Sequence, residues 1–351
     1  MDILESFKLK RKQQLALGLV LLISLVSVII FSIMQGAVEI DGGTVIKVIL
    51  GKITGNERFF GDTESGIIAV IWDIRLPRIL CGALVGGGLA VAGLIFQSIL
   101  QNPLADPYTM GVSTGAAFGA SLAILLNVTY GIFFPVSAAA LICAGLTLVT
   151  VILIANRGGG NIVSNLIVAG IILSSILSAA ISFIKMLAGE NVSAIVFWIM
   201  GSLSACNWGD VCLVFPVILT SALISSYYAK NLNIISLGDK NADALGLNAK
   251  LTRISFLIIG AAITAVCVSI CGVIGFIGLI VPHMLRFSLT GDNRALVPLS
   301  ALLGANLLCI ADNLTRVFCR GEIPVGVLTT LLGGPFFIYI FIRKKRGGLG
   351  E

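Results

Sequence analysis

The chain has 351 residues, a net charge of +6 and a mean hydropathy of +1.06. Only 11% of its residues are charged and 57% are hydrophobic, whereas a water-soluble domain carries roughly a quarter of charged residues. A surface of this composition must face lipid. The composition therefore excludes soluble enzymes and nucleic-acid-binding modules, and it indicates an integral membrane protein whose single transmembrane domain covers residues 1–351.

Apolar stretches long enough to cross a bilayer recur along the chain. A helix needs about 20 residues to cross a hydrocarbon core of roughly 30 Å, whereas barrel strands would alternate in polarity over about 10 residues. The first stretch is too long for a removable signal peptide and lacks a small-residue cleavage site. The sequence therefore predicts an all-α polytopic bundle with ten spans: Leu15–Met34, Arg78–Leu100, Gly111–Leu126, Ile132–Ala155, Asn165–Leu187, Val211–Tyr228, Leu251–Ile270, Ile274–Leu289, Leu299–Val317 and Gly326–Ile342.

Basic residues cluster at the two ends of the chain. They lie in Lys8–Lys12, before the first span, and in Arg343–Arg346, after the last. Clusters of this kind stay in the cytoplasm, so the number of crossings must be even. We expect a multi-pass protein of the cell membrane with both termini in the cytoplasm.

Three of the predicted connections are longer or more apolar than simple turns. Gln35–Trp72, on the outer side, is predicted to contain a short surface helix around Val45–Leu50. Ser193–Gly201, also outside, is apolar and is predicted to form an interfacial or re-entrant helix. Asn231–Lys250 lies in the cytoplasm and is the most informative of the three.

This cytoplasmic segment has the signature of a short amphipathic helix. Asp239 can cap it, Ala242 and Leu245 give it one apolar face, and Gly246 can end it. Such a helix either lies on lipid headgroups or docks into a groove of a partner protein. The segment contains only two lysines to bind headgroups, so we favour the partner.

Glycine accounts for 40 residues and is concentrated in particular spans. Small residues spaced along a span let helix backbones approach closely in lipid. We therefore expect tightly packed helices where glycines gather: Gly82, Gly86, Gly87, Gly88, Gly93, Gly111, Gly115, Gly119, Gly272, Gly275 and Gly278.

Side chains that could carry catalysis or ion coupling are sparse. His283 is the one histidine, and no GxSxG, HExxH or paired-carboxylate motif occurs in a span. A proton- or sodium-coupled transporter usually places carboxylates at mid-membrane, but only Asp312, near the outer end of a span, comes close. The sequence also lacks a G-x-x-x-x-G-K-[ST] phosphate loop. We expect no catalytic residue, no metal and no cofactor on this chain, so any ATP must be bound by another chain.

Arginines are unexpectedly placed on the outer side. Arg75 and Arg78 flank the start of the second span, and Arg316 and Arg320 lie near the end of the ninth. They could anchor helix ends by reaching toward the interface. They could also form a docking surface for acidic side chains, because arginine pairs with carboxylates through two parallel hydrogen bonds.

Three long segments resemble the permease subunits of ABC importers for ferric siderophores, haem and cobalamin. They are RLPRILCGALVGGGLAVAGLIFQSILQNPLADPYTMGVSTGA at Arg75–Ala116, LGDKNADALGL at Leu237–Leu247 and GVIGFIGLIVPHMLRFSLTGDNRALVP at Gly272–Pro298. The resemblance implies a path between two permease subunits, the second being a copy or a paralogue. It also implies two ATP-binding subunits that use ATP-Mg, and an extracytoplasmic substrate-binding protein that delivers the chelate.

The resemblance further implies roles for individual residues. The fifth span would line the path, and the cytoplasmic coupling helices would fall at about 232–249. The implied binding-protein docking residues are Arg75, Arg78 and Arg316; the ATPase-coupling residues are Leu237, Gly238, Asp239, Ala242, Leu245 and Gly246; the cytoplasmic gate residues are Val163 and Ser164.

The expected function is therefore the import of an iron chelate, driven by ATP that a partner hydrolyses. The GSLS stretch at Gly201–Ser204 slightly favours siderophores over cobalamin. Haem or cobalamin import by the same architecture is the first alternative. An ion-coupled secondary transporter would need carboxylates at mid-membrane, and an intramembrane enzyme would need a convergent polar cluster.

Overall fold

The computed structural model describes residues 3–36, 38–61, 63–289, 291–318 and 323–347. Within these residues all regular secondary structure is helical. Eight helices are long and apolar enough to cross a membrane, and two more have shorter apolar stretches. The predicted polytopic helical bundle is confirmed, and each of the ten predicted spans coincides with a helix.

Most of these helices lie within a few residues of the predicted bounds, but α1 begins at Ile3 rather than Leu15 and α14 begins at Asn293 rather than Leu299. The helices that coincide with the ten predicted spans are α1 (Ile3–Met34), α4 (Leu76–Ile99), α5 (Val112–Tyr130), α6 (Val136–Arg157), α7 (Ile162–Ala188), α9 (Trp208–Tyr227), α12 (Ala249–Cys271), α13 (Ile277–Ser288), α14 (Asn293–Phe318) and α15 (Val325–Gly347). The connections contain α2 (Gly42–Thr54), η1 (Glu57–Phe59), α3 (Ser65–Ala69), η2 (Val70–Arg75), η3 (Pro107–Met110), η4 (Gly189–Asn191), α8 (Val192–Ile199), α10 (Ala229–Ile235) and α11 (Asp239–Ala244).

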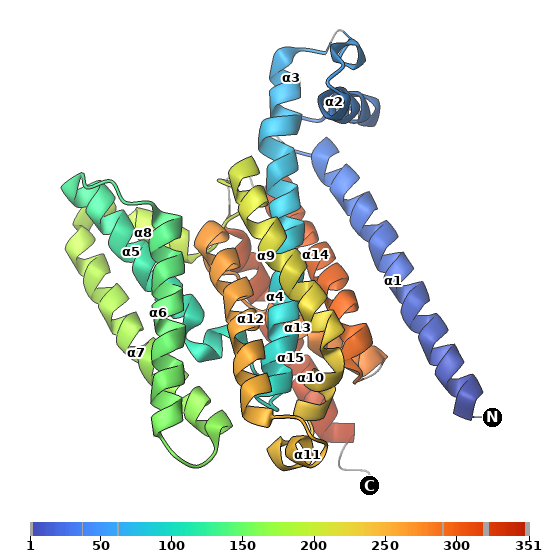
Figure 1. Ribbon diagram of the computed structural model, residues 1–351. Coiled ribbons are helices and arrows are strands. Elements are labelled where there is room, and N and C mark those ends of the chain that lie inside the picture. Colours follow the sequence, from blue (N-terminus) through green and yellow to red (C-terminus); the bar gives the residue numbers. More distant parts are fainter. Residues whose placement is uncertain (1–2, 37, 62, 290, 319–322, 348–351) are drawn as a thin grey trace.

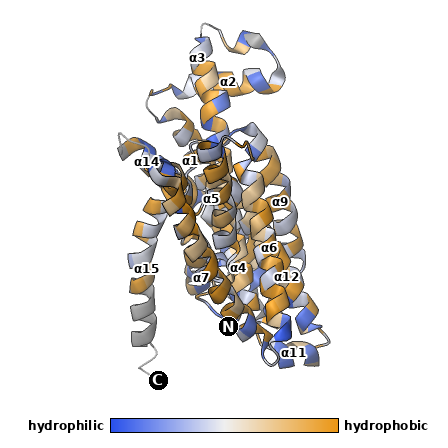
Figure 2. Cartoon of the chain, turned by 90° about the vertical axis from the view of Figure 1, so that its left-hand side faces the viewer, coloured by the Kyte–Doolittle hydropathy of each residue, from blue (hydrophilic) through white to orange (hydrophobic). Residues whose placement is uncertain are grey.

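The two ends of the bundle differ in which connections they carry. The start of α1 and the end of α15 lie at the same end as α11, whereas α2 and α3 project from the opposite end (Figure 1). Hydrophobic residues cover the long helices, and hydrophilic residues gather around α11 (Figure 2). This arrangement agrees with an even number of crossings, and we refer to the α11 end as cytoplasmic and the α2 end as outer.

The two helices predicted in the outer connections are present. α2 covers Val45–Leu50, and the carboxylate of Asp41 accepts hydrogen bonds from the backbone N–H groups of Gly43 and Thr44 at its start. Such a cap satisfies donors that the first helical turn leaves free. α8 occupies the place of the predicted interfacial or re-entrant helix at Ser193–Gly201.

The second span differs from its prediction because the helix does not begin at Arg78. A continuous helical stretch runs over Ser65–Ile99, through α3, the π-helical turn η2 and α4. Pro77 lies in the first turn of α4 and has no N–H to donate to the preceding turn. A π-helical turn directly before it changes the hydrogen-bond register there, and Arg75 and Arg78 consequently share one continuous helix.

α4 forms the centre of the bundle and packs against α9, α12, α13 and α14. In the most apolar part of this span 83% of residues are buried, compared with 22% for the span that contains α7. A Cβ atom on Gly86 would lie 2.4 Å from the carbonyl oxygen of Gly304, and one on Gly93 would lie 1.9 Å from that of Gly278. Both distances are too short for a side chain, so the prediction that glycines permit close helix packing is confirmed.

Candidate functional site

Arg75 holds the outer end of α1. The residue ends the π-helical turn η2, is only 5% exposed, and points its guanidinium at the last turn of α1. Its Nη1 donates to the carbonyl oxygens of Ile33 (2.6 Å) and Met34 (3.2 Å), and its Nη2 donates to that of Val38. The last carbonyls of a helix have no partner within the helix, and a cation is favourable beside them.

Arg316, near the end of α14, reaches the same helix end from the other side. Its Nη1 donates to the carbonyl oxygen of Ser32 (3.2 Å) and its Nη2 to that of Gln35 (2.6 Å). A Cβ atom on Gly36 would lie 2.6 Å from Nη2 of Arg75 and 3.1 Å from Nη2 of Arg316. The two guanidiniums therefore converge on Gly36, and a side chain at this position would displace the guanidinium of Arg75.

Arg78 completes this outer arginine cluster, which we define as Arg75, Arg78 and Arg316. Its Nε and Nη2 donate to the carboxylate of Asp312 at 2.8–3.2 Å. The side chains of Arg78 and Asp312 are 13% and 4% exposed. A buried carboxylate is tolerated when it is paired and hydrogen-bonded, which explains how α14 carries Asp312.

Sequence reasoning identified these arginines but not their partners inside the molecule. The carbonyl oxygens that Arg75 and Arg316 bind belong to the chain around the end of α1, which no side-chain motif reveals. Arg320, which the sequence places in the same group, lies outside the described residues.

The predicted coupling segment forms two short helices, α10 and α11, at the cytoplasmic end. α11 ends at Ala244 and, as predicted, Gly246 terminates it, because its φ of +79° is a left-handed conformation that glycine adopts without strain. The N–H of Leu247 donates to the carbonyl oxygen of Ala242, and that of Gly246 donates to the carbonyl oxygen of Asp243. This pair of bonds is the Schellman motif, which satisfies the last carbonyls of a helix.

Asp239 does not cap α11, and that part of the prediction is wrong. Gly238, with a φ of +102°, occupies the cap position, and no side chain caps the helix. Asp239 is the first residue of α11, and its carboxylate accepts hydrogen bonds from Arg253 of α12. The carboxylate is drawn away from the backbone because a buried guanidinium is a stronger partner than a free N–H.

The apolar face of this segment is divided between the bundle and the surface. Ala242 is fully buried against the bundle, whereas Leu237 and Leu245 are 62% and 65% exposed. Two exposed leucines beside a buried alanine, at the cytoplasmic end, leave apolar surface that another protein can cover.

Val163 and Ser164, the expected gate residues, lie in the first turn of α7. Asn161 caps this helix by accepting a hydrogen bond from the backbone N–H of Val163 (2.9 Å). Ser164 is exposed and Val163 is half-buried. A cavity of about 250 Å³ adjoins this turn, and it is lined by Ala155, Asn156, Gly159, Gly160, Ile162, Asn165 and Lys250.

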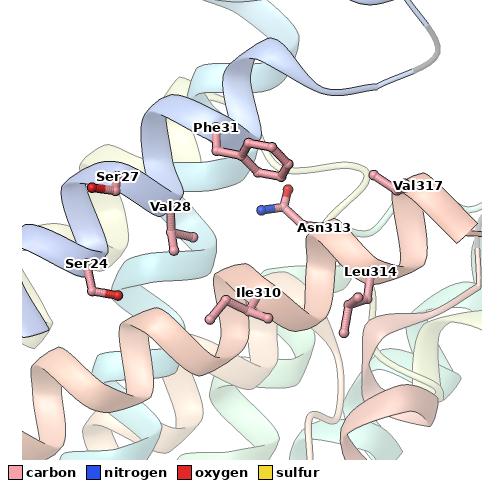
Figure 3. Close-up of a pocket in the computed structure, with 8 residues that line it drawn as sticks. All are labelled: Ser24, Ser27, Val28, Phe31, Ile310, Asn313, Leu314 and Val317. Carbon is pink, nitrogen blue, oxygen red and sulfur yellow. The ribbon is translucent and has the colours of Figure 1, made fainter.

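Two further pockets differ in their chemistry. The pocket between α1 and α14, of about 470 Å³, has no charged side chain among its lining residues, and Asn313 is its most polar group (Figure 3). A larger pocket of about 690 Å³ carries a carboxylate, that of Asp106. This second pocket, which we call the Asp106 pocket, is lined by Asp106, Tyr108, Ile199, Met200, Val273, Gly275, Phe276, Leu279, Gly326, Val327, Thr330 and Leu331.

Comparisons with known proteins agree over nearly the whole chain. The model of the FecCD transport family matches residues 22–343. The Fe(3+)-citrate import system permease protein YfmE of Bacillus subtilis is 35% identical over 341 residues, which cover 96% of this chain and 98% of the relative. The cobalamin import system permease protein BtuC of Halobacterium salinarum is 38% identical over 288 residues, which cover 82% and 76%. A solved structure described as an inward-facing conformation of a metal-chelate type ABC transporter matches with a TM-score of 0.81 and 31% identity, over 93% of this chain and 98% of the other.

Proposed function

This chain belongs to the FecCD transport family and is a multi-pass ABC transporter permease, and from that premise we propose that it imports a ferric chelate. The main support for this class of cargo is the match over 93% of the chain to a metal-chelate type transporter. The Fe(3+)-citrate permease, matched over 98% of its length, supports the same class. Energy for import comes from ATP that a separate subunit binds and hydrolyses.

We propose that a second permease, either a copy or a paralogue, completes the translocation path along α7. This helix is among the least buried spans, and its exposed residues include Ser175, Ser178 and Ser182 at helical spacing. The hydroxyls of Ser175 and Ser182 donate to carbonyl oxygens of their own helix at 2.9 Å and 3.0 Å. Small hydroxyls such as these two, whose protons are donated within their own helix, suit a path that lets a bulky chelate pass without binding it tightly.

For the cytoplasmic end we propose that Leu237 and Leu245 dock into the ATP-binding subunit. Their exposure beside the buried Ala242 supports this role. Leu245→Asp should abolish co-purification of the ATP-binding subunit while the permease remains folded, because a charge in an apolar groove is desolvated without a partner. Co-purification at the level of the unmodified chain would contradict this docking role.

For the outer end we propose that Arg78 and Arg316 meet carboxylates of the substrate-binding protein. Arg75 supports them indirectly, because its guanidinium is buried against the end of α1. Arg78→Glu combined with Arg316→Glu should weaken binding of the substrate-binding protein about a hundredfold, since like charges then face each other. The ATP-binding subunit should still co-purify, and unchanged binding of the substrate-binding protein would contradict the proposal.

The cargo is tested by uptake in a strain that lacks this permease. Uptake of radiolabelled iron as ferric citrate and as a ferric hydroxamate siderophore is compared with uptake of haemin and cyanocobalamin. We expect the strain to lose uptake of at least one ferric chelate and to regain it when the chain is restored. Normal uptake of both ferric chelates together with loss of cyanocobalamin or haemin uptake would overturn the assignment.

Import of cobalamin is the second candidate, because a cobalamin permease is 38% identical to this chain. That relative is matched over 76% of its length, whereas the Fe(3+)-citrate permease is matched over 98%. The ferric chelate therefore remains the first candidate, and the uptake experiment separates the two.

A further inference from the structure

Arg253 is buried where the cytoplasmic helix α11 meets the membrane-spanning bundle. It lies in the second turn of α12 and is 0% exposed, and it is among the largest fully buried side chains of the described residues. A buried guanidinium must be paired and hydrogen-bonded to be tolerated. Its partners therefore show which elements it holds together.

The donors of Arg253 divide between α11 and α4. Nη1 and Nη2 donate to the carboxylate of Asp239, the first residue of α11, at 2.9 Å and 2.6 Å. Nε donates at 2.8 Å to the carbonyl oxygen of Ile99, the last residue of α4. The planar fork of arginine satisfies both partners at once, which a lysine ammonium does not.

We propose that Arg253 is a positioning residue that transmits displacements of α11 to the cytoplasmic end of α4. The proposal rests on the proposed function, in which α11 docks into the ATP-binding subunit. The Asp239 side chain is 40% exposed and that of Arg253 is 0% exposed. If α11 moved alone, a buried charge would lose its counter-ion, which is strongly unfavourable. α11, α12 and the end of α4 therefore move as one unit.

A second hydrogen bond connects α10, the other helix of the coupling segment, to the chain just after α4. The side chain of Gln101, two residues after Ile99, donates through Nε2 to the carbonyl oxygen of Ile235 at the end of α10 (3.1 Å). α10 is also fixed to the start of α14, because the Asn233 amide oxygen accepts the backbone N–H of Asn293 (2.8 Å). Both helices of the coupling segment, α10 and α11, are thus hydrogen-bonded to the bundle.

Contacts inside the bundle extend the connection from α4 to the Asp106 pocket. Gln97, one half-turn before Ile99, donates to the carbonyl oxygen of Leu279 (3.2 Å). The backbone of α4 at Gly93 also touches Gly278, with no room for an added Cβ atom. Leu279 lines the Asp106 pocket, so a shift at the cytoplasmic end of α4 reaches the pocket wall through packed atoms.

The test measures whether ATP changes the accessibility of that pocket. Thr330 lines the pocket and is exposed, so Thr330→Cys is labelled with a maleimide in the reconstituted complex with the ATP-binding subunit, without nucleotide and with ATP plus vanadate. The chain without this change corrects for labelling of its natural cysteines. We expect the labelling rate to change about tenfold between the two states, within the range usual for coupled sites.

The decisive variant removes both charges, Arg253→Met with Asp239→Asn, so that no buried charge is left unpaired. In complexes that contain the ATP-binding subunit, we expect the labelling rate of this variant to change less than about twofold between the two states. The matched control is Arg294→Gln, which breaks the exposed Arg294–Asp292 pair at the same end and should keep the full change. A full change in the double variant would overturn the proposal.

A further variant covers the case in which the double variant does not fold. Arg253→Lys keeps the buried positive charge but cannot hold both partners, and it should show a reduced change. A full change with Arg253→Lys would overturn the proposal on its own. If the unmodified chain captures no ATP-binding subunit, the proposed function itself has failed, and this inference falls with it.

Discussion

Arginines hold α4 at both ends, but the two ends are built on different principles. At the outer end, Arg75 and Arg316 share the unpaired carbonyls around the end of α1, and Arg78 pairs with Asp312. At the cytoplasmic end, the one guanidinium of Arg253 joins α4, α11 and α12. At the outer end two guanidiniums bind the same helix end, whereas the ion pair that joins α11 to the bundle depends on the single side chain of Arg253.

This difference indicates that the outer end fixes the spans to each other, whereas the cytoplasmic end transmits movement. The outer arginines join spans of the bundle to each other, and each span also has its own packing contacts. Arg253 joins the bundle to a six-residue helix, α11, which projects from it at the cytoplasmic end (Figure 1). Redundant bonds tolerate the loss of one member, while a single buried charge does not. The comparison therefore predicts a graded set of effects.

The largest effect is expected from Asp239→Ala. This change leaves the fully buried guanidinium of Arg253 without its carboxylate, which should cost about 3 kcal/mol of unfolding free energy. The measurement is the unfolding transition of the detergent-solubilised protein. Arg294→Gln, on an exposed ion pair, should cost less than about 1 kcal/mol. Equal stabilities of the two variants would show that the buried Arg253–Asp239 pair contributes no more than an exposed ion pair at the same end.

A smaller loss is expected from Arg78→Gln at the outer end. The carboxylate of Asp312 is 4% exposed and loses a charged partner, which should cost about 2 kcal/mol. Adding Asp312→Asn should restore at least half of that loss, because the amide pair carries no buried charge. If the second change makes the protein less stable still, Asp312 has a role beyond this pair.

Replacement of Arg75 by lysine should have the smallest effect on stability. Lysine keeps the charge but loses the fork that binds several carbonyls, at an expected cost of about 1 kcal/mol. Arg316 still holds the same helix end, and this limits the loss. The combination with Arg316→Lys should therefore cost more than the sum of the single changes, and strict additivity would show that the two guanidiniums act independently.

The contribution of the Asp239–Arg253 ion pair to stability should not depend on pH near neutrality. The hydrogen bonds from Arg253 lower the pKa of the Asp239 carboxyl below its ordinary value of 3.8. Because the pKa is lower in the folded state, the stabilisation is fully present above about pH 5 and is lost as the pH falls through the folded value. The stability difference between the unmodified chain and Asp239→Asn should be constant from about pH 5 to 8. A decline within that window would mean that another group titrates with the pair.

The sequence by itself determined the properties that depend on neighbouring residues. The length of each apolar stretch fixed the spans, and glycines such as Gly86 and Gly93 marked where backbones would touch. Gly246 fixed the end of α11 because a left-handed residue there depends on local backbone sterics. Long segments in Arg75–Ala116 and elsewhere were specific enough to identify the family. None of these features requires knowledge of distant contacts.

Only the tertiary structure decided what the charged side chains do. Arg253 and Ile99 are 154 positions apart, and Arg78 and Asp312 are 234 positions apart. Local periodicity carries no information about such pairs, because they form only when packed helices bring the two groups together in a medium that forbids an unpaired charge. For the same reason Asp239, expected from its position to cap α11, instead accepts the guanidinium that the fold buries beside it.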